Sequence, residues 1–281
     1  MLNLKVIRAE HAGACYGVQR ALDMTIEACE SGMGVCTLGP LIHNPRVVNQ
    51  LREKGIDVAD GVDGVNTEGV VIRSHGVVPE VVERLSQSGV KVVDATCPHV
   101  LRAQRAAAKL AQEGRHVLVV GEAGHPEVEG ISAHARAVGG VCTIVGGVSD
   151  IPEDLPAEVG IVVQTTQSRE KLDQVVEALR DRGLDLEVKD TICFATTQRQ
   201  KAAIDLAQSV DAMVVIGGRN SSNTTRLFEM CQRHCSAAFH VEGAEEIQPE
   251  WFEGCAVVGV SAGASTPDDQ ISSVEMYLRS L

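Results

Sequence analysis

The 281-residue sequence is poor in aromatic residues, in cations and in long apolar runs. Its aromatics are four Phe, two Tyr and one Trp, so aliphatic side chains must fill the core. Lys and Arg number 25 against 38 Asp and Glu, a formal net charge of −13, which argues against a non-specific binder of nucleic acid or anionic membranes. No stretch approaches the roughly 18 apolar residues of a membrane span, and the N-terminus has no apolar signal region. We therefore expect a cytoplasmic protein that binds neither nucleic acid nor membrane.

Several cofactor and disulfide signatures are also missing. The sequence has no Gly-x-Gly-x-x-Gly and no P-loop lysine motif, so we expect neither a bound nicotinamide or flavin nor an NTPase. Electrons for any redox reaction would then come from a separate carrier protein. Nine cysteines, an odd number without a secretory signal, argue against a disulfide framework. No Cys-x-x-Cys occurs, and the pair Cys231 and Cys235 has the spacing of a packed helix face.

Apolar runs alternate with amphipathic segments along the whole chain, which indicates α/β units with mostly parallel strands. At roughly 150 residues per domain the length suggests about two domains, but a repeat indicates three. Cys15, Cys97 and Cys193 each follow a short strand pattern and open a helical one. A polar loop lies 28 residues beyond each cysteine, at His43, at His125 and at Ser221.

A second polar loop follows in each repeat, and these loops contain His75, Thr165 and Ser265. We predict three α/β lobes, 14–96, 97–192 and 193–281, with the N-terminal strand within 1–13 completing the third. Ligands of open α/β sheets bind beyond the carboxyl ends of the strands. If the lobes are related by a pseudo-threefold axis, as a trefoil, all these loops face one central cavity with the three thiols at its floor.

The repeated thiols suggest a metal centre. Three thiolates can hold three corners of a [4Fe-4S] cluster, which usually has four cysteine ligands, and the fourth iron would stay open for catalysis. Cys15, Cys97 and Cys193 are the candidate ligands. We interpret the remaining cysteines as core or surface residues: Cys29, Cys36, Cys142, Cys231, Cys235 and Cys255.

The loops supply neutral or singly positive donors, which suit a phosphate or diphosphate without a Lys/Arg cluster. They are His43, His75, His125, Thr165, Ser221, Ser222, Asn223 and Ser265. Glu127 is the only carboxylate within the loop motifs, and in a pocket beside a metal it would act as proton donor. Spacing leaves Glu129 as an alternative, since it would share a face with Glu127 in an extended segment.

Six strings make the sequence resemble the 4-hydroxy-3-methylbut-2-enyl diphosphate reductase family of the non-mevalonate isoprenoid route. The resemblance runs from about Cys15 to Pro267, and its strings begin at these residues: Asp94 (DATCP), Ala123 (AGHPEVEG), Gln164 (QTT), Cys193 (CFATTQRQ), Asn220 (NSSN) and Ala262 (AGASTP).

The resemblance implies an α/β trefoil around a [4Fe-4S] cluster held by Cys15, Cys97 and Cys193. It implies that the substrate hydroxyl binds the open iron, that Glu127 delivers protons and that Thr165 relays protons or orients the hydroxyl. The diphosphate would be held by His43, His75, His125, Ser221, Ser222, Asn223 and Ser265. Two electrons, from a donor such as ferredoxin or flavodoxin, and two protons would remove the hydroxyl as water through an allyl-type intermediate. The products would be isopentenyl diphosphate and dimethylallyl diphosphate.

The sequence departs from the family at three places. Gly-Ala-Cys-Tyr replaces the usual Gly-Phe-Cys around Cys15, so that Ala14 precedes the cysteine and Tyr16 follows it, after an unusual Ala9-Glu10-His11-Ala12. Gln198 stands where Asn is more usual, and Asp268-Asp269-Gln270 replaces a less polar run. None of these changes falls on a candidate ligand.

Three other functions remain possible on the residues alone. An open-iron cluster could act as a Lewis acid in a hydro-lyase or hydratase, without net electron transfer. The same fold could be a non-catalytic iron-sulfur sensor or scaffold. Three thiolates and a water could also bind zinc in a hydrolase.

Overall fold

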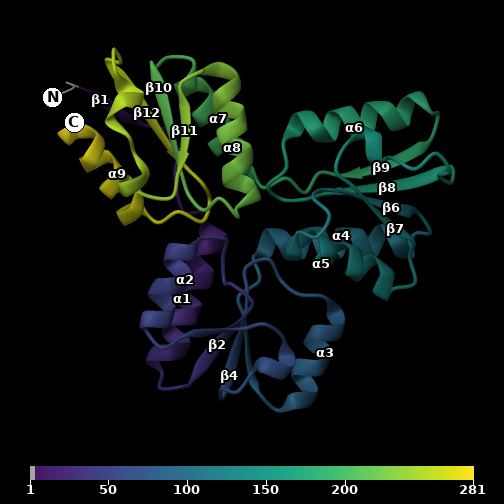
Figure 1. Cartoon of the computed structure of the whole chain (residues 1–281). Helices are drawn as coiled ribbons and strands as arrows, with labels where there is room; N and C mark the ends of the chain where they lie inside the picture. The colour runs from purple at the N-terminus through teal and green to yellow at the C-terminus, as the bar shows by residue number, and fades with distance from the viewer. Residues whose placement is uncertain (1–3) are drawn as a thin grey trace. The chain divides into compact units, whose positions relative to one another are not determined.

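The structure is a computed structural model that describes residues 4–281, in which helices and parallel strands alternate (Figure 1). The strands are β1 (Lys5–Arg8), β2 (Val35–Leu38), β3 (Asp57–Ala59), β4 (Gly69–Ile72), β5 (Lys91–Asp94), β6 (His116–Val120), β7 (Cys142–Val145), β8 (Glu158–Val163), β9 (Asp185–Lys189), β10 (Ala212–Ile216), β11 (Ala238–Val241) and β12 (Val257–Ala262). The α-helices are α1 (Tyr16–Glu30), α2 (Pro45–Glu53), α3 (Pro79–Ser88), α4 (Pro98–Gln112), α5 (Pro126–Ala137), α6 (Arg169–Asp181), α7 (Phe194–Ala207), α8 (Ser222–His234) and α9 (Asp268–Ser280).

The strands form three four-stranded parallel sheets that share one topology. Their orders are β3-β2-β4-β5, β7-β6-β8-β9 and β11-β10-β12-β1. In each sheet three consecutive strands run from an inner strand to one edge and then to the other inner strand, and the fourth strand forms the opposite edge. The predicted α/β class with three repeated units is therefore confirmed.

The fourth strand of each sheet leads to one of the three repeated cysteines. β5 precedes Cys97, β9 precedes Cys193, and β1 precedes Cys15. β1 pairs in parallel with β12, with Arg8 opposite Val260, so the N-terminal strand is the edge of the third sheet.

The chain divides into two compact units that do not follow the predicted lobe boundaries. The first unit comprises Met1–Val18, His43–Asn49 and Phe194–Leu281, and the second comprises Gln19–Ile42 and Gln50–Cys193. The third sheet lies in the first unit, and the other two sheets lie in the second. The boundaries 14–96, 97–192 and 193–281 remain a prediction, and we describe each compact unit by itself.

The first unit has apolar cores on both faces of its sheet. On one face α9 contributes Ile271, Val274 and Leu278 to a core that includes Phe252. On the other face α7 and α8 pack against Met213 and Val215 through side chains such as Leu227 and Cys231. β-Branched and aliphatic residues thus fill most of the space, as expected for a sequence with few aromatics.

The second unit holds the first and second sheets, each with its own core. Val70, Ile72 and Leu85 belong to the core of the first sheet. In the second sheet α4 and α5 lie together against one face and α6 covers the other (Figure 1). Small residues such as Ala103 and Ala107 let α4 approach the strands closely. Across residues 4–281, no helix combines the length and apolarity needed to cross a bilayer.

Candidate active site

The three repeated cysteines are fixed by the same backbone hydrogen bond. The N–H of Cys15 donates to the carbonyl of Ala264 at 3.1 Å, that of Cys97 to Ser74 at 2.9 Å, and that of Cys193 to Thr165 at 2.9 Å. Each acceptor lies in the loop after the neighbouring inner strand. In every repeat the cysteine is therefore held beside a predicted ligand loop, and all three thiols are partly exposed.

The other cysteines lie in different surroundings. Cys36 and Cys142 are buried in strands, and Cys231 and Cys235 are buried in the core of the first unit. Burial raises the pKa of the Cys231 thiol to about 12 and also raises the pKa of Cys235. Both thiols are therefore protonated near neutral pH, which opposes metal binding because thiolate is the ligand form. Cys231 packs from α8 into this core as predicted, whereas Cys235 lies just after the helix, in extended backbone, and is buried in the same core.

In the second unit, Glu127 and Thr165 form a buried pair. Glu127 is only 2% exposed. Its Oε1 accepts a 2.6 Å hydrogen bond from the backbone N–H of Thr165, and its Oε2 accepts a 2.9 Å bond from the Thr165 hydroxyl. The first turn of α5 supplies Glu127, and the loop after β8 supplies Thr165. The carboxylate is thereby held in one orientation beside the backbone that also positions Cys193.

His125 caps the same helix. Its Nδ1 accepts a hydrogen bond from the N–H of Glu127 at 3.1 Å. Because Nδ1 acts as an acceptor, the ring proton of this neutral imidazole resides on Nε2. His125 thus offers a ring N–H donor at the start of α5.

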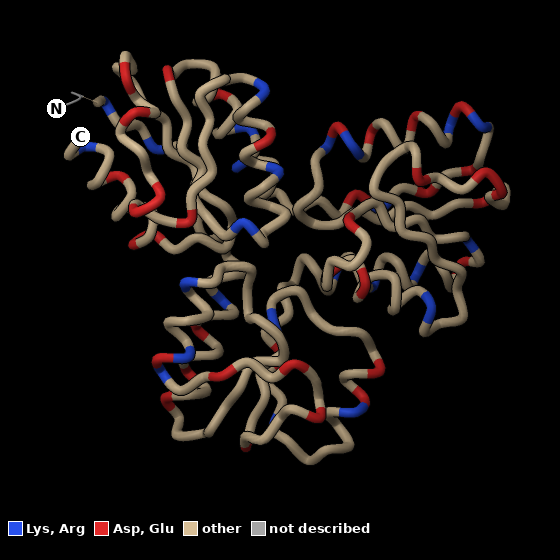
Figure 2. The backbone as a smooth tube through the Cα atoms, viewed as in Figure 1, with Lys and Arg blue, Asp and Glu red and all other residues tan. Residues whose placement is uncertain are grey.

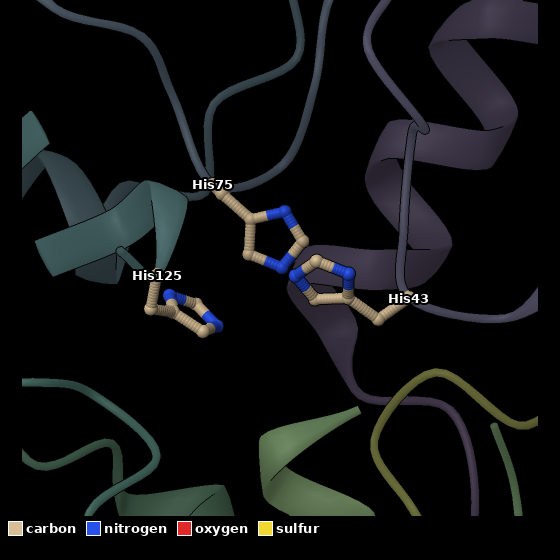
Figure 3. A group of neighbouring side chains, drawn as sticks. All are labelled: His43, His75 and His125. Atoms are coloured by element: carbon tan, nitrogen blue, oxygen red, sulfur yellow. The ribbon is translucent and has the colours of Figure 1, made fainter. Parts of the chain in front are cut away.

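His75 lies beside His125. The two ring centroids are 5.5 Å apart with an interplanar angle of 83° (Figure 3). The nitrogen atoms through which they could bind a ligand lie within 4.8 Å of each other. His75 comes from the loop after β4 in the first sheet, so this pair joins loops from both sheets of the second unit.

Glu129, the alternative proton donor, faces a different cleft. Its Oε1 accepts a hydrogen bond from the N–H of Gly124 at 3.0 Å. It lines a cleft of about 330 Å³ with Arg73 and Arg84, whereas Glu127, His75 and Thr165 are absent from that lining. Because α5 starts at Pro126, the two glutamates are separated by helical rather than extended geometry. The structure therefore places the two carboxylates in different surroundings.

In the first unit, His43 is tied to the loop that contains Ser265. The Ser265 hydroxyl donates to the His43 carbonyl at 3.1 Å. Asn44 donates from Nδ2 to the Ser265 carbonyl at 2.8 Å, while its Oδ1 accepts hydrogen bonds at the start of α2. The side chain of Ser265 thus bonds to the His43 loop, and the side chain of Asn44 bonds to the Ser265 loop.

Gln270 supports this arrangement and was not among the predicted site residues. Its Oε1 accepts a hydrogen bond from Asn44 at 2.9 Å, and its Nε2 donates to the Glu242 carbonyl at 2.6 Å. Asn44 itself carries a local signal, since Asn before Pro is typical of a helix cap. Nothing local indicates Gln270, because its partner lies 226 positions away.

The loop after β10 gathers the remaining polar side chains of the first unit. Ser221 caps α8 by accepting a hydrogen bond from the N–H of Thr224. The buried Nδ2 of Asn223 has no hydrogen-bond partner among the described residues. A buried, unpaired donor is costly, so Asn223 fits a ligand acceptor. Gly218 lets the loops meet, because a Cβ there would lie 2.9 Å from the His43 carbonyl oxygen.

The segment before Cys15 is anchored to α7. Gly13 has a φ of 97°, in the left-handed region that favours glycine. Arg199, which is 5% exposed, donates to the Gly13 carbonyl at 2.7 Å. Two of the sequence departures meet nearby, since Gln198 Nε2 lies 3.5 Å from His11 Nε2. Tyr16, the displaced aromatic, is 68% exposed.

The repeated parallel sheets, with a buried carboxylate on α5 bonded to the loop after β8, define an α/β enzyme. Residues 6–279 match the family described as LytB protein. The chain belongs to this family.

Several relatives carry a common name. A 4-hydroxy-3-methylbut-2-enyl diphosphate reductase from Aquifex aeolicus is 45% identical over 278 residues, covering 98% of this chain and 96% of that protein. The one from Citrifermentans bemidjiense is 46% identical over 282 residues, covering 97% and 98%.

Solved structures agree with this assignment. One, described as (E)-4-hydroxy-3-methyl-but-2-enyl diphosphate reductase, the terminal enzyme of the non-mevalonate pathway, is 43% identical with a TM-score of 0.73 and full coverage of both chains. A Plasmodium falciparum reductase, 24% identical with a TM-score of 0.90, covers 98% of this chain and 88% of its own and supports the fold. Membership of the LytB family implies an iron-sulfur cofactor.

Proposed function

We propose that this chain reductively removes the hydroxyl group of 4-hydroxy-3-methylbut-2-enyl diphosphate. Two electrons and two protons enter, the C–O bond breaks, one water leaves, and isopentenyl diphosphate or dimethylallyl diphosphate forms. The names of the full-length relatives support this reaction. The observation that carries it is the buried Glu127–Thr165 pair, because it places a protonatable group against a hydroxyl in the family's loop motif.

The cofactor in this proposal is a [4Fe-4S] cluster held by Cys15, Cys97 and Cys193. The three thiols fit such a group because all are partly exposed and each lies on a backbone fixed by the same kind of hydrogen bond. When bound, the cluster supplies electrons and one iron without a protein ligand. Soft thiolates are the ligands that iron-sulfur clusters prefer.

The diphosphate is assigned to the polar side chains that the family resemblance implies: His43, His75, His125, Ser221, Ser222, Asn223 and Ser265. The unpaired amide of Asn223 and the ring N–H of His125 support this assignment. Helix N-termini add partial positive charge at Ser221 and His125, which lowers the energy of a bound anion in an acidic protein.

Glu127 is the proton donor and Thr165 orients the substrate hydroxyl. The carboxylate accepts two hydrogen bonds from Thr165. When Oε2 carries a proton, the 2.9 Å bond reverses and Glu127 donates to the threonine hydroxyl, which can pass its own proton on. Burial excludes bulk water from this path. His125, whose Nδ1 accepts from the N–H of Glu127, holds the start of α5 and with it the carboxylate.

The test is anaerobic purification followed by incubation with the substrate and reduced methyl viologen. We expect a coloured iron-sulfur protein that consumes the substrate and releases both five-carbon diphosphates. A cluster-loaded protein that leaves the substrate unchanged would refute the reductase assignment. Consumption that needs no reductant would identify a hydro-lyase, and a colourless zinc protein would identify a hydrolase.

A further inference from the structure

Helix α4 has an exposed cationic face. Pro98, Arg102, Arg105 and Lys109 follow one another at intervals of four, three and four residues, and all are exposed. These positions form one stripe of a helix. The opposite stripe is buried against the second sheet and α5: Val100, Ala103, Gln104, Ala107, Leu110 and Ala111.

The charge on this face is unusual for the protein. Acidic residues occur around all three sheets (Figure 2), and the net charge is −13. α4 nevertheless contains no Asp or Glu. Its cations therefore stand out as a local patch of the opposite sign.

Of the three cationic side chains on this face, only Lys109 has an acidic partner within residues 4–281. Lys109 pairs with Glu113 at 3.7 Å, and its charge also helps to lower the pKa of Glu187. Arg102 and Arg105 have no ion pair within the described part of the chain. The two arginines thus keep their full attraction for an incoming anionic surface.

This patch starts at a proposed cluster ligand. Cys97 is the N-cap of α4. At 1.5 Å per residue, Arg102 lies only about 7.5 Å along the helix axis from that cysteine. The flanking positions Leu101, Ala106 and Ala108 have short or half-buried side chains, so a protein surface can approach the helix closely.

We propose that this α4 face, formed by Pro98, Arg102, Arg105 and Lys109, is the docking surface for an acidic electron-carrier protein. The inference rests on the proposed function, since the carrier serves a cluster at Cys97. Each reduced one-electron carrier gives up one electron and leaves oxidised. Two docking events therefore supply the two electrons that, with two protons, break the C–O bond and release water.

The experiment compares Arg102→Glu/Arg105→Glu with wild-type holoenzyme. An acidic [4Fe-4S] ferredoxin serves as the probe, and its Kd is measured by calorimetry at several salt concentrations. Charge reversal should raise the Kd at low salt at least about tenfold, since close charge pairs across an interface commonly contribute that much. The salt dependence of binding should flatten as well. Turnover with reduced methyl viologen should stay within about twofold of wild type.

Arg180→Glu is the matched control, because Arg180 is an exposed arginine on α6 of the same unit. It should bind ferredoxin as wild type does. Equal affinity of the double variant and wild type, or equal weakening by Arg180→Glu, would overturn the docking proposal. If the double variant loses its cluster, the single variant Arg105→Gln is measured in its place, and its Kd for ferredoxin is compared with those of wild type and Arg180→Glu in the same way. Failure of wild-type turnover with methyl viologen would instead refute the proposed function, and ferredoxin binding would still be scored separately.

Discussion

Thr165 donates a hydrogen bond to each carboxylate oxygen of Glu127, one from its backbone N–H at 2.6 Å and the other from its hydroxyl at 2.9 Å. The same threonine accepts the N–H of Cys193 through its carbonyl. One residue therefore links the proposed proton donor to a proposed cluster ligand. The pair is buried within a single compact unit, which makes it the most sharply defined part of the candidate site.

Glu127→Gln should lower kcat at least about 10²-fold, the scale expected for a lost general acid. The amide has nearly the shape of the carboxyl group but cannot deliver a proton. Substrate consumption with reduced methyl viologen measures the rate, and the absorption spectrum should show that the cluster is retained.

Glu129→Gln is the control for this variant. Glu129 bonds to Gly124 and lines another cleft, so its replacement should leave kcat within about threefold of wild type. A large loss in Glu129→Gln together with a normal rate in Glu127→Gln would reverse the two assignments.

Thr165→Val should reduce kcat while Thr165→Ser restores most of it. Valine keeps the size of the side chain but leaves Glu127 Oε2 without its hydroxyl donor. A lost hydrogen bond costs about 1 kcal/mol, so the melting temperature should fall as well. A serine variant as slow as the valine variant would show that the methyl group, rather than the hydroxyl, matters.

Cys97→Ser should abolish cluster retention, because a hydroxyl group is a poor substitute for a thiolate toward iron. Iron and acid-labile sulfide analysis after anaerobic purification measures the effect. Cys231→Ala provides the comparison, since Cys231 is a fully buried core residue. It should lose some stability and keep the cluster. Full iron content in Cys97→Ser would remove Cys97 from the ligand set.

Gln270→Leu should raise the KM for the substrate several-fold with less effect on kcat. The substitution removes the bonds from Gln270 to Asn44 and to the Glu242 carbonyl. Asn44 then loses one of the restraints that keep the His43 and Ser265 loops together. Gln270→Glu retains the acceptor for Asn44 and should recover part of the affinity. An unchanged KM in Gln270→Leu would show that the loop contact does not reach the substrate.

Stability should fall at alkaline pH through Cys231. Its pKa is about 12 in the folded protein against a reference value of 9.0. Between these values the unfolded thiol loses its proton while the folded one keeps it, so unfolding becomes easier as pH rises. The contribution is complete below about pH 9 and decreases by about 1.4 kcal/mol per pH unit above it.

Urea unfolding followed by Trp251 fluorescence measures this effect. Trp251 is the only tryptophan, and it stacks on Phe239 in the same unit as Cys231, with ring centroids 4.3 Å apart. The difference in unfolding free energy between wild type and Cys231→Ala should shrink from pH 9 to pH 10. A difference independent of pH would contradict the assigned shift.

The repeat, the strands before Cys15, Cys97 and Cys193, and the packing of Cys231 could all be predicted from the sequence. Such features depend on local periodicity and spacing. Short apolar strands bounded by polar loops leave a clear pattern in the sequence, from which these features can be predicted. The choice between Glu127 and Glu129 could not be predicted in this way. It depends on where α5 begins and on a hydrogen bond to Thr165, 38 positions away.

The sequence by itself determined the α/β class, the threefold register of the thiols and the set of loops that could hold a diphosphate. Only the tertiary structure decided which side chains meet: Glu127 with Thr165, His75 with His125, and Asn44 with both Ser265 and Gln270. The physical reason is that strand and helix patterns are properties of neighbouring residues. Hydrogen bonds between loops depend instead on side-chain directions that are set only after the sheets assemble.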